Sequence, residues 1–111
     1  MTNETIELIK KLQIQILNLS EKLEEAKEGL EKIELAITEE IINDSTLTNE
    51  NKRKIALKNK LNVDNGFLTL KRAIAEGEHD KAMLQIELEK EKNTFKLLLA
   101  EKMEKGIRYD I

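Results

Sequence analysis

Apolar residues recur along the first third of the chain at alternating steps of three and four positions. The series runs through Ile9, Leu12, Ile16, Leu19, Leu23, Ala26, Leu30, Ile33 and Ile37. Such a heptad seam predicts a long helix that buries one stripe against a partner helix. The cluster Asn43-Asp44-Ser45-Thr46 follows, and these side chains compete for backbone hydrogen bonds. We therefore expect a first helix over about residues 4–42, with Thr2 or Asn3 as its N-cap.

The same spacing returns in the second half of the chain. It runs through Phe67, Leu70, Ile74, Gly77, Lys81, Leu84, Leu88, Glu91, Phe95, Leu98 and Lys102. This predicts a second long helix over about residues 66–105 that ends near Gly106. Several seam positions are polar, and Ala82, Met83 and Ile86 lie off the seam, so we expect the buried stripe to shift between faces.

A short helix is expected between the two long ones, over about residues 48–61. Thr48 is its expected N-cap, and Ile55, Leu57 and Leu61 are its expected apolar contacts, with Lys58 and Lys60 in solvent. Residues 62–66 predict a second break, because Asn, Asp and Gly favour turns, and Asp64 or Asn65 can cap the helix that follows.

Together these elements predict an all-α fold built as a long, coiled-coil-like antiparallel helical hairpin with a short elbow helix. We interpret residues 1–111 as one helical domain that assembles into a helical bundle. The composition agrees, since aromatic residues are 3% of the chain and proline is absent. If Ile42 lies near Gly66, Gly29 comes opposite Gly77. A close backbone approach there is one explanation of both glycines, and ordinary tolerance of glycine within a helix is the other.

Charge is distributed unevenly along the chain. Residues 1–49 carry a net charge of −6, residues 50–72 carry +5 and residues 73–111 carry −2. The positive residues of the elbow are Lys52, Arg53, Lys54, Lys58, Lys60, Lys71 and Arg72. Such a cluster attracts phosphate or an acidic partner. A solvated elbow, or one that pairs with the acidic stalk of a neighbouring molecule, is the alternative interpretation.

A further set of apolar residues lies off the seam near the two ends of the chain. It contains Ile6, Leu8, Ile14, Leu17, Leu97, Leu99 and Met103. A two-helix hairpin covers one stripe per helix, so these residues predict contact with another molecule. We expect a homo-oligomer, specifically a dimer that forms a four-helix bundle.

Motifs for catalysis or cofactor binding do not occur in the sequence. It has no phosphate-binding glycine loop, no zinc-protease motif and no serine or cysteine nucleophile motif. Glu76 and His79 have the spacing of a di-metal carboxylate ligand pair, but His79 is the single histidine. We therefore expect no catalytic, metal-binding or cofactor-binding residues. The sequence also has no apolar run of membrane-spanning length and no signal peptide after Met1, which predicts a soluble cytoplasmic protein.

The elbow carries a local pattern of its own, from Leu47 to Leu57. Leu47, Asn49, Arg53, Lys54, Ala56 and Leu57 match the pattern L-x-N-x-x-x-R-K-x-A-L. With the long charged helix that follows, this resembles small phage- and prophage-encoded helical proteins. The resemblance implies an accessory protein of a mobile element, sometimes encoded near DNA recombination functions, and it implies no activity. Frequent Lys, Ile and Asn fit a low-GC bacterial or phage source.

Two functions remain open at this stage. The first is a non-enzymatic coiled-coil adaptor that binds itself and another protein. The alternative is a nucleic-acid accessory protein, acting in recombination or replication, that contacts phosphates through the basic elbow.

Overall fold

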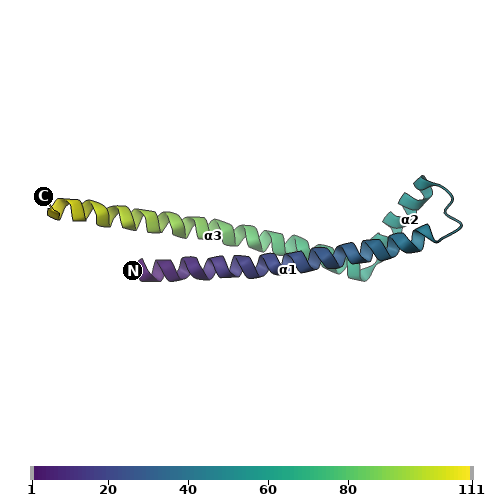
Figure 1. The fold of residues 1–111 in the computed structure, drawn as a ribbon, viewed down its shortest axis with the longest axis horizontal. Helices are drawn as coiled ribbons and strands as arrows, with labels where there is room; N and C mark the ends of the chain where they lie inside the picture. Colours follow the sequence, from purple (N-terminus) through teal and green to yellow (C-terminus); the bar gives the residue numbers. More distant parts are fainter. Residues whose placement is uncertain (1, 111) are drawn as a thin grey trace. The chain divides into compact units, whose positions relative to one another are not determined.

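A computed structural model describes the backbone of residues 2–110 and the side chains of residues 3–104. It contains three helices over these residues: α1 (Thr2–Ile42), α2 (Glu50–Val63) and α3 (Asn65–Asp110). Figure 1 labels them along the chain, and the backbone of residues 2–110 forms no strand. The all-α prediction is confirmed.

The heptad seam predicted for α1 is the face that the structure buries. Leu12, Leu23 and Ile37 are buried, and the intervening seam residues are half-buried. Ile41 extends the buried line by one turn, since it is only 3% exposed. After α1 the carboxylate of Asp44 accepts hydrogen bonds from the amide and the hydroxyl of Thr46. This local pairing replaces helical hydrogen bonds, as expected for the residues that follow position 42.

The seam predicted for α3 is also confirmed from Phe67 to Leu98. Phe67 is buried, and each further seam position up to Leu98 is half-buried, including the polar positions Lys81 and Glu91. The expected shift of the stripe between faces is wrong, because Ala82, Met83 and Ile86 are all exposed. A constant 3–4 spacing keeps one face toward the partner helix even where single positions are polar.

Three predicted helix ends differ from the structure. Thr2 and Asn3 are both helical residues of α1, so neither is its N-cap. Thr48 is not the N-cap of α2; Asn49 is, and its side chain accepts a hydrogen bond from the Lys52 amide at 2.8 Å. Helix α3 does not end near Gly106 but continues to Asp110. A glycine ends a helix by adopting a positive φ, and none of the described glycines has one.

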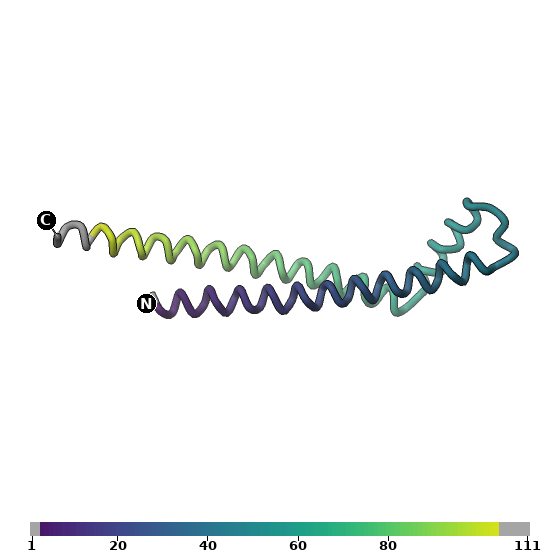
Figure 2. Tube along the Cα trace, in the orientation of Figure 1, coloured from purple at the N-terminus to yellow at the C-terminus, as the bar shows by residue number. Residues whose placement is uncertain are grey.

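The predicted break at residues 62–66 narrows to one residue, Asp64. It lies between Val63 and Asn65, the last residue of α2 and the first of α3. Its carboxylate accepts a hydrogen bond from the Phe67 amide at 2.7 Å, so Asp64 caps α3 as expected. The turn from α1 through residues 43–49 into α2 can be followed in Figure 2.

The chain forms two compact units. Unit 1 contains residues 1–20 and 79–111, and unit 2 contains residues 21–78. In unit 1 the N-terminal part of α1 runs antiparallel to the C-terminal part of α3 (Figure 1). Unit 2 contains the rest of both long helices and the whole of α2.

Unit 2 has a different helix register from the one expected. A Cβ atom on Gly66 would lie 3.4 Å from Ile33, and one on Gly29 would lie 3.2 Å from Leu70. Gly66 therefore lies beside Ile33 rather than Ile42, which is about two and a half helical turns away. The expected pairing of Gly29 with Gly77 is wrong for the same reason, because Gly29 packs against Leu70.

Helix α2 accounts for the shifted register. It lies beside the last turns of α1 (Figure 1), where the Lys60 ammonium approaches the Glu40 carboxylate at 3.5 Å. The surface of α1 near Glu40 therefore faces α2, and α3 begins further down α1. As predicted, Leu57 and Leu61 are half-buried while Lys58 and Lys60 are exposed. Ile55 differs from its expected packing, since 56% of it is exposed.

Candidate interaction surfaces

The basic elbow is a set of seven exposed cations, all of which lie in unit 2. They are Lys52, Arg53, Lys54, Lys58, Lys60, Lys71 and Arg72. The structure brings cations from both helices together, because Lys54 and Lys58 of α2 line one shallow hollow with Lys71 of α3. The basic elbow thus includes three cations that converge on one hollow at the junction of α2 and α3.

Contacts within the chain engage four of these seven cations. Lys60 pairs with Glu40 at 3.5 Å, and Lys54 pairs with Glu50 at 3.8 Å. The Arg53 Nε donates a hydrogen bond to the backbone carbonyl of Leu47 at 3.3 Å. The Lys71 ammonium lies 5.7 Å from the centre of the Phe67 ring. Such exposed contacts contribute about 1 kcal/mol or less each, so they leave the cations available to a partner.

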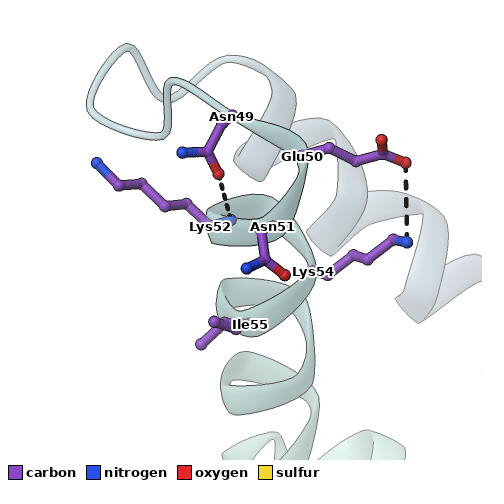
Figure 3. Close-up of a pocket in the computed structure, with 6 residues that line it drawn as sticks. All are labelled: Asn49, Glu50, Asn51, Lys52, Lys54 and Ile55. Atoms are coloured by element: carbon purple, nitrogen blue, oxygen red, sulfur yellow. Dashed lines mark hydrogen bonds and ion pairs between the residues drawn. The ribbon is translucent and has the colours of Figure 1, made fainter.

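Three cations make no ion pair, side-chain hydrogen bond or ring contact with another described residue, and they are the strongest candidates for binding an external anion. They are Lys52, Lys58 and Arg72. Figure 3 shows Lys52 at the start of α2, beside a hollow formed with Asn49, Glu50, Asn51, Lys54 and Ile55. In the figure the Lys52 side chain extends away from the Glu50–Lys54 ion pair.

One carboxyl group beside the elbow has a shifted pKa. The Thr46 hydroxyl donates a hydrogen bond to the Asp44 carboxylate, the Thr46 amide adds a second, and Lys60 contributes positive charge. These interactions favour the ionised form and hold the pKa of Asp44 below its ordinary value. Asp44 is therefore a structural anion of the α1–α2 loop at neutral pH.

The carboxylates and the single histidine do not gather into a site. No group of three His, Asp or Glu side chains within the described part of the chain is placed to hold a metal ion. The His79 side chain is 76% exposed, and its nearest charged neighbour is Asp80 at 3.7 Å. Glu76 and His79 are both exposed positions of α3.

Most of the apolar residues expected to form an oligomer interface are exposed on unit 1. Ile14 and Leu17 are each 58% exposed, Leu97 is 68%, Met103 is 62% and Leu99 is 44% exposed. Ile6 and Leu8 differ from this group, because they are half-buried. Both residues lie next to Ile9 of the α1 seam, so the surface that partly covers Ile9 also partly covers them.

Sequence analysis missed two members of this exposed apolar surface, Met83 and Ile86 of α3. Met83 is 54% exposed and Ile86 is 64% exposed. Both line a shallow hollow that also includes Lys90. Their spacing of three residues indicates a second apolar line on α3. The sequence analysis instead assigned both residues to a shifted part of the buried stripe.

Searches of family models, curated proteins and solved structures find no match to the chain. Across the residues that the structure describes, each helix is too short or too polar to span a bilayer.

Proposed function

We propose that this protein is a non-enzymatic coiled-coil interaction protein that associates with itself and presents its helices to another protein. The supporting observation is that unit 1 has few buried apolar side chains and many exposed ones. Of the five buried apolar side chains among the described residues, Leu12 is the one in unit 1. Against it stand seven large apolar side chains that are 44–68% exposed: Ile14, Leu17, Met83, Ile86, Leu97, Leu99 and Met103.

This balance favours association because a pair of helices buries little surface by itself. Covering an exposed Leu, Ile or Met contributes roughly 1.5–3 kcal/mol, and association costs roughly 4–15 kcal/mol. Several such residues on each chain are enough to exceed that cost. Met83, Ile86 and Leu97 share one exposed face of α3, and apolar residues gathered on one exposed face are typical of interaction sites.

Light scattering coupled to size exclusion tests the proposal directly on the full chain. The expected molar mass at high micromolar concentration is a multiple of the 12.8 kDa chain mass, and it should fall on dilution. A monodisperse 12.8 kDa particle at all concentrations would contradict self-association.

The elbow pattern supports a biological setting for this function. Its resemblance to small phage- and prophage-encoded helical proteins suggests an accessory protein of a mobile element. Under this proposal the protein acts in the cytoplasm of a bacterial or phage-infected cell. Affinity purification from that cell identifies the partner protein.

A second candidate function is phosphate contact by a nucleic-acid accessory protein, and the basic elbow favours it. Lys52, Lys58 and Arg72 are exposed, and no ion pair or side-chain hydrogen bond joins them to another described residue. Cations that contact phosphates release condensed counterions, which makes binding steeply salt-dependent.

The triple variant Lys52→Glu, Arg53→Glu, Lys54→Glu is expected to abolish any mobility shift of a DNA duplex seen at low salt. For the unmodified chain, the affinity should fall steeply as salt is added. The logarithm of the binding constant should fall by roughly 0.9 per phosphate contact for each tenfold rise in salt concentration. The measurement is an electrophoretic titration at two salt concentrations.

The matched control is Lys10→Glu, Lys11→Glu, Lys22→Glu, which makes the same charge change on exposed residues of α1. If both triple variants weaken binding equally, net charge rather than the elbow is responsible. Absence of binding by the unmodified chain at low salt would contradict this second function.

A further inference from the structure

A second heptad line runs along α3 within unit 1, on the face opposite to the buried seam. When Phe67 is assigned heptad position a, this line occupies positions c and f, about 160° around the helix from the a/d seam. Its exposed members, which we call the outer stripe, are Met83, Ile86, Lys90, Asn93, Leu97 and Ala100. Each step is three or four residues, which is the spacing of a coiled-coil seam that has no partner within the chain.

The outer stripe reads the same in both directions: two apolar residues, two polar residues and two apolar residues. We propose that two copies of the chain pair antiparallel along this stripe, a proposal that rests on the self-association proposed above. The pairing has one register in which apolar faces apolar and polar faces polar. In that register Met83 faces Ala100 of the partner subunit, Ile86 faces Leu97 of the partner subunit, and Lys90 faces Asn93 of the partner subunit.

A two-fold axis repeats each of these three contacts, so the interface contains six layers of facing side chains. Sliding the partner by one heptad in one direction puts Lys90 against Ala100 and Asn93 against Leu97 of the partner subunit. Sliding it the other way puts Met83 against Asn93 and Ile86 against Lys90 of the partner subunit. Both shifts bury polar groups against apolar ones, whereas the proposed register places them together at the centre.

Charges that flank the outer stripe favour the same register. On one side Glu89 comes opposite Lys96 of the partner subunit, and the axis makes this ion pair twice. On that side Ala82 also comes opposite Met103 of the partner subunit, which covers a side chain that is 62% exposed. On the other side Glu87 comes opposite Thr94 of the partner subunit. Asp80 comes opposite Glu101 of the partner subunit at the outer edge, where solvent and salt screen the repulsion.

The arrangement assigns distinct roles to the exposed apolar residues. Ile86, Leu97 and Met103 lie in or beside the contact between copies. Ile14, Leu17 and Leu99 lie outside it and remain available for a different protein. In unit 1, α3 then contacts α1 of its own chain on one face and α3 of the partner subunit on the other.

Cysteine cross-linking tests this register without interference, because the chain contains no cysteine. The double variant Ile86→Cys, Leu97→Cys is expected to form a disulfide-linked dimer under mild oxidation. The two positions of one chain are about 16 Å apart along α3, too far for an internal disulfide. Either single variant should stay unlinked, because the antiparallel register puts each position equally far from its own copy. Linkage of the single variants would indicate a parallel pairing and overturn the proposal.

Charge reversal gives an independent readout in solution. Glu89→Lys alone and Lys96→Glu alone should each raise the dimer dissociation constant about tenfold, since each places like charges opposite one another twice. The double variant should restore the dissociation constant to within about twofold. Glu87→Lys is the matched control, because it makes the same charge change opposite Thr94 of the partner subunit.

The two proposals fail in different ways. A monomeric unmodified chain in sedimentation equilibrium would contradict self-association itself. A dimeric unmodified chain, without cross-linking of the Ile86→Cys, Leu97→Cys variant and without charge-reversal rescue, would overturn the outer-stripe register alone.

Discussion

Replacing Phe67 with alanine is expected to lower the free energy of unfolding by about 3–5 kcal/mol, the usual cost of truncating a buried Phe. Phe67 is 6% exposed and is the buried residue that α3 contributes among the described side chains. It also lines the same hollow as Leu57 and Leu61 of α2, so its loss removes apolar surface where α2 and α3 meet. Total stabilities of about 5–15 kcal/mol make this a large fraction. Urea unfolding followed by circular dichroism measures the change.

The adjacent variant Leu68→Ala is the control for this experiment. Leu68 lies on the same turn of α3 and is 38% exposed, so we expect a loss below about 1 kcal/mol. Equal losses for the two variants would show that Phe67 is not a core residue of unit 2.

Replacing Leu97 with glutamate is expected to convert the self-associated protein to monomer at concentrations where the unmodified chain associates. Leu97 is 68% exposed in the single chain, so its substitution should leave the helices intact. Each two-fold contact loses two copies of a residue whose burial contributes roughly 1.5–3 kcal/mol. The dissociation constant should therefore rise at least a hundredfold, at about 1.4 kcal/mol for each factor of ten. Light scattering over a dilution series provides the measurement.

Leu35→Glu is the matched control for the effect of Leu97→Glu. Leu35 is 64% exposed on α1, but it belongs to unit 2. We expect its molar mass profile to match that of the unmodified chain. If Leu35→Glu dissociates the protein as strongly as Leu97→Glu, the interface is not confined to unit 1.

Local sequence signals were enough to predict the helices and their buried faces. Ile9 to Ile37 and Phe67 to Leu98 follow a strict 3–4 spacing, and burial follows the same residues. This agreement arises because heptad periodicity encodes a helix face directly. Capping at Asp64 was also predictable, since the Asp side chain accepts the amide hydrogen bond of a helix start.

The register of α1 against α3 in unit 2 could not be predicted from these signals. A heptad seam fits its partner after a shift of any whole number of heptads, so spacing alone leaves several registers open. The contact of α2 with the end of α1 near Glu40 selects one of them. That contact joins residues distant in sequence. Helix α2 is mostly polar, so its sequence gave little indication that it packs against α1.

The candidate surfaces were predicted unequally well. The seven cations of the basic elbow could be recognised from charge alone, and all seven are exposed. The apolar surface was predicted less completely, because Ile6 and Leu8 are half-buried while Met83 and Ile86 are exposed. Distinguishing a second seam from a displaced first one requires knowing which face the partner helix occupies.

The single non-helical residue between α2 and α3 makes the junction at Asp64 a potential hinge for domain swapping. The residues on both sides of Asp64 are already helical, and the hydrogen bond that the Phe67 amide donates to the Asp64 carboxylate holds the bend. Replacing Asp64 with a strong helix former removes that bond and favours one continuous helix across α2 and α3. Helix α3 would then leave α1 of its own chain and pair with α1 of another. Substitution of this one residue would then convert a closed chain into an exchanged pair.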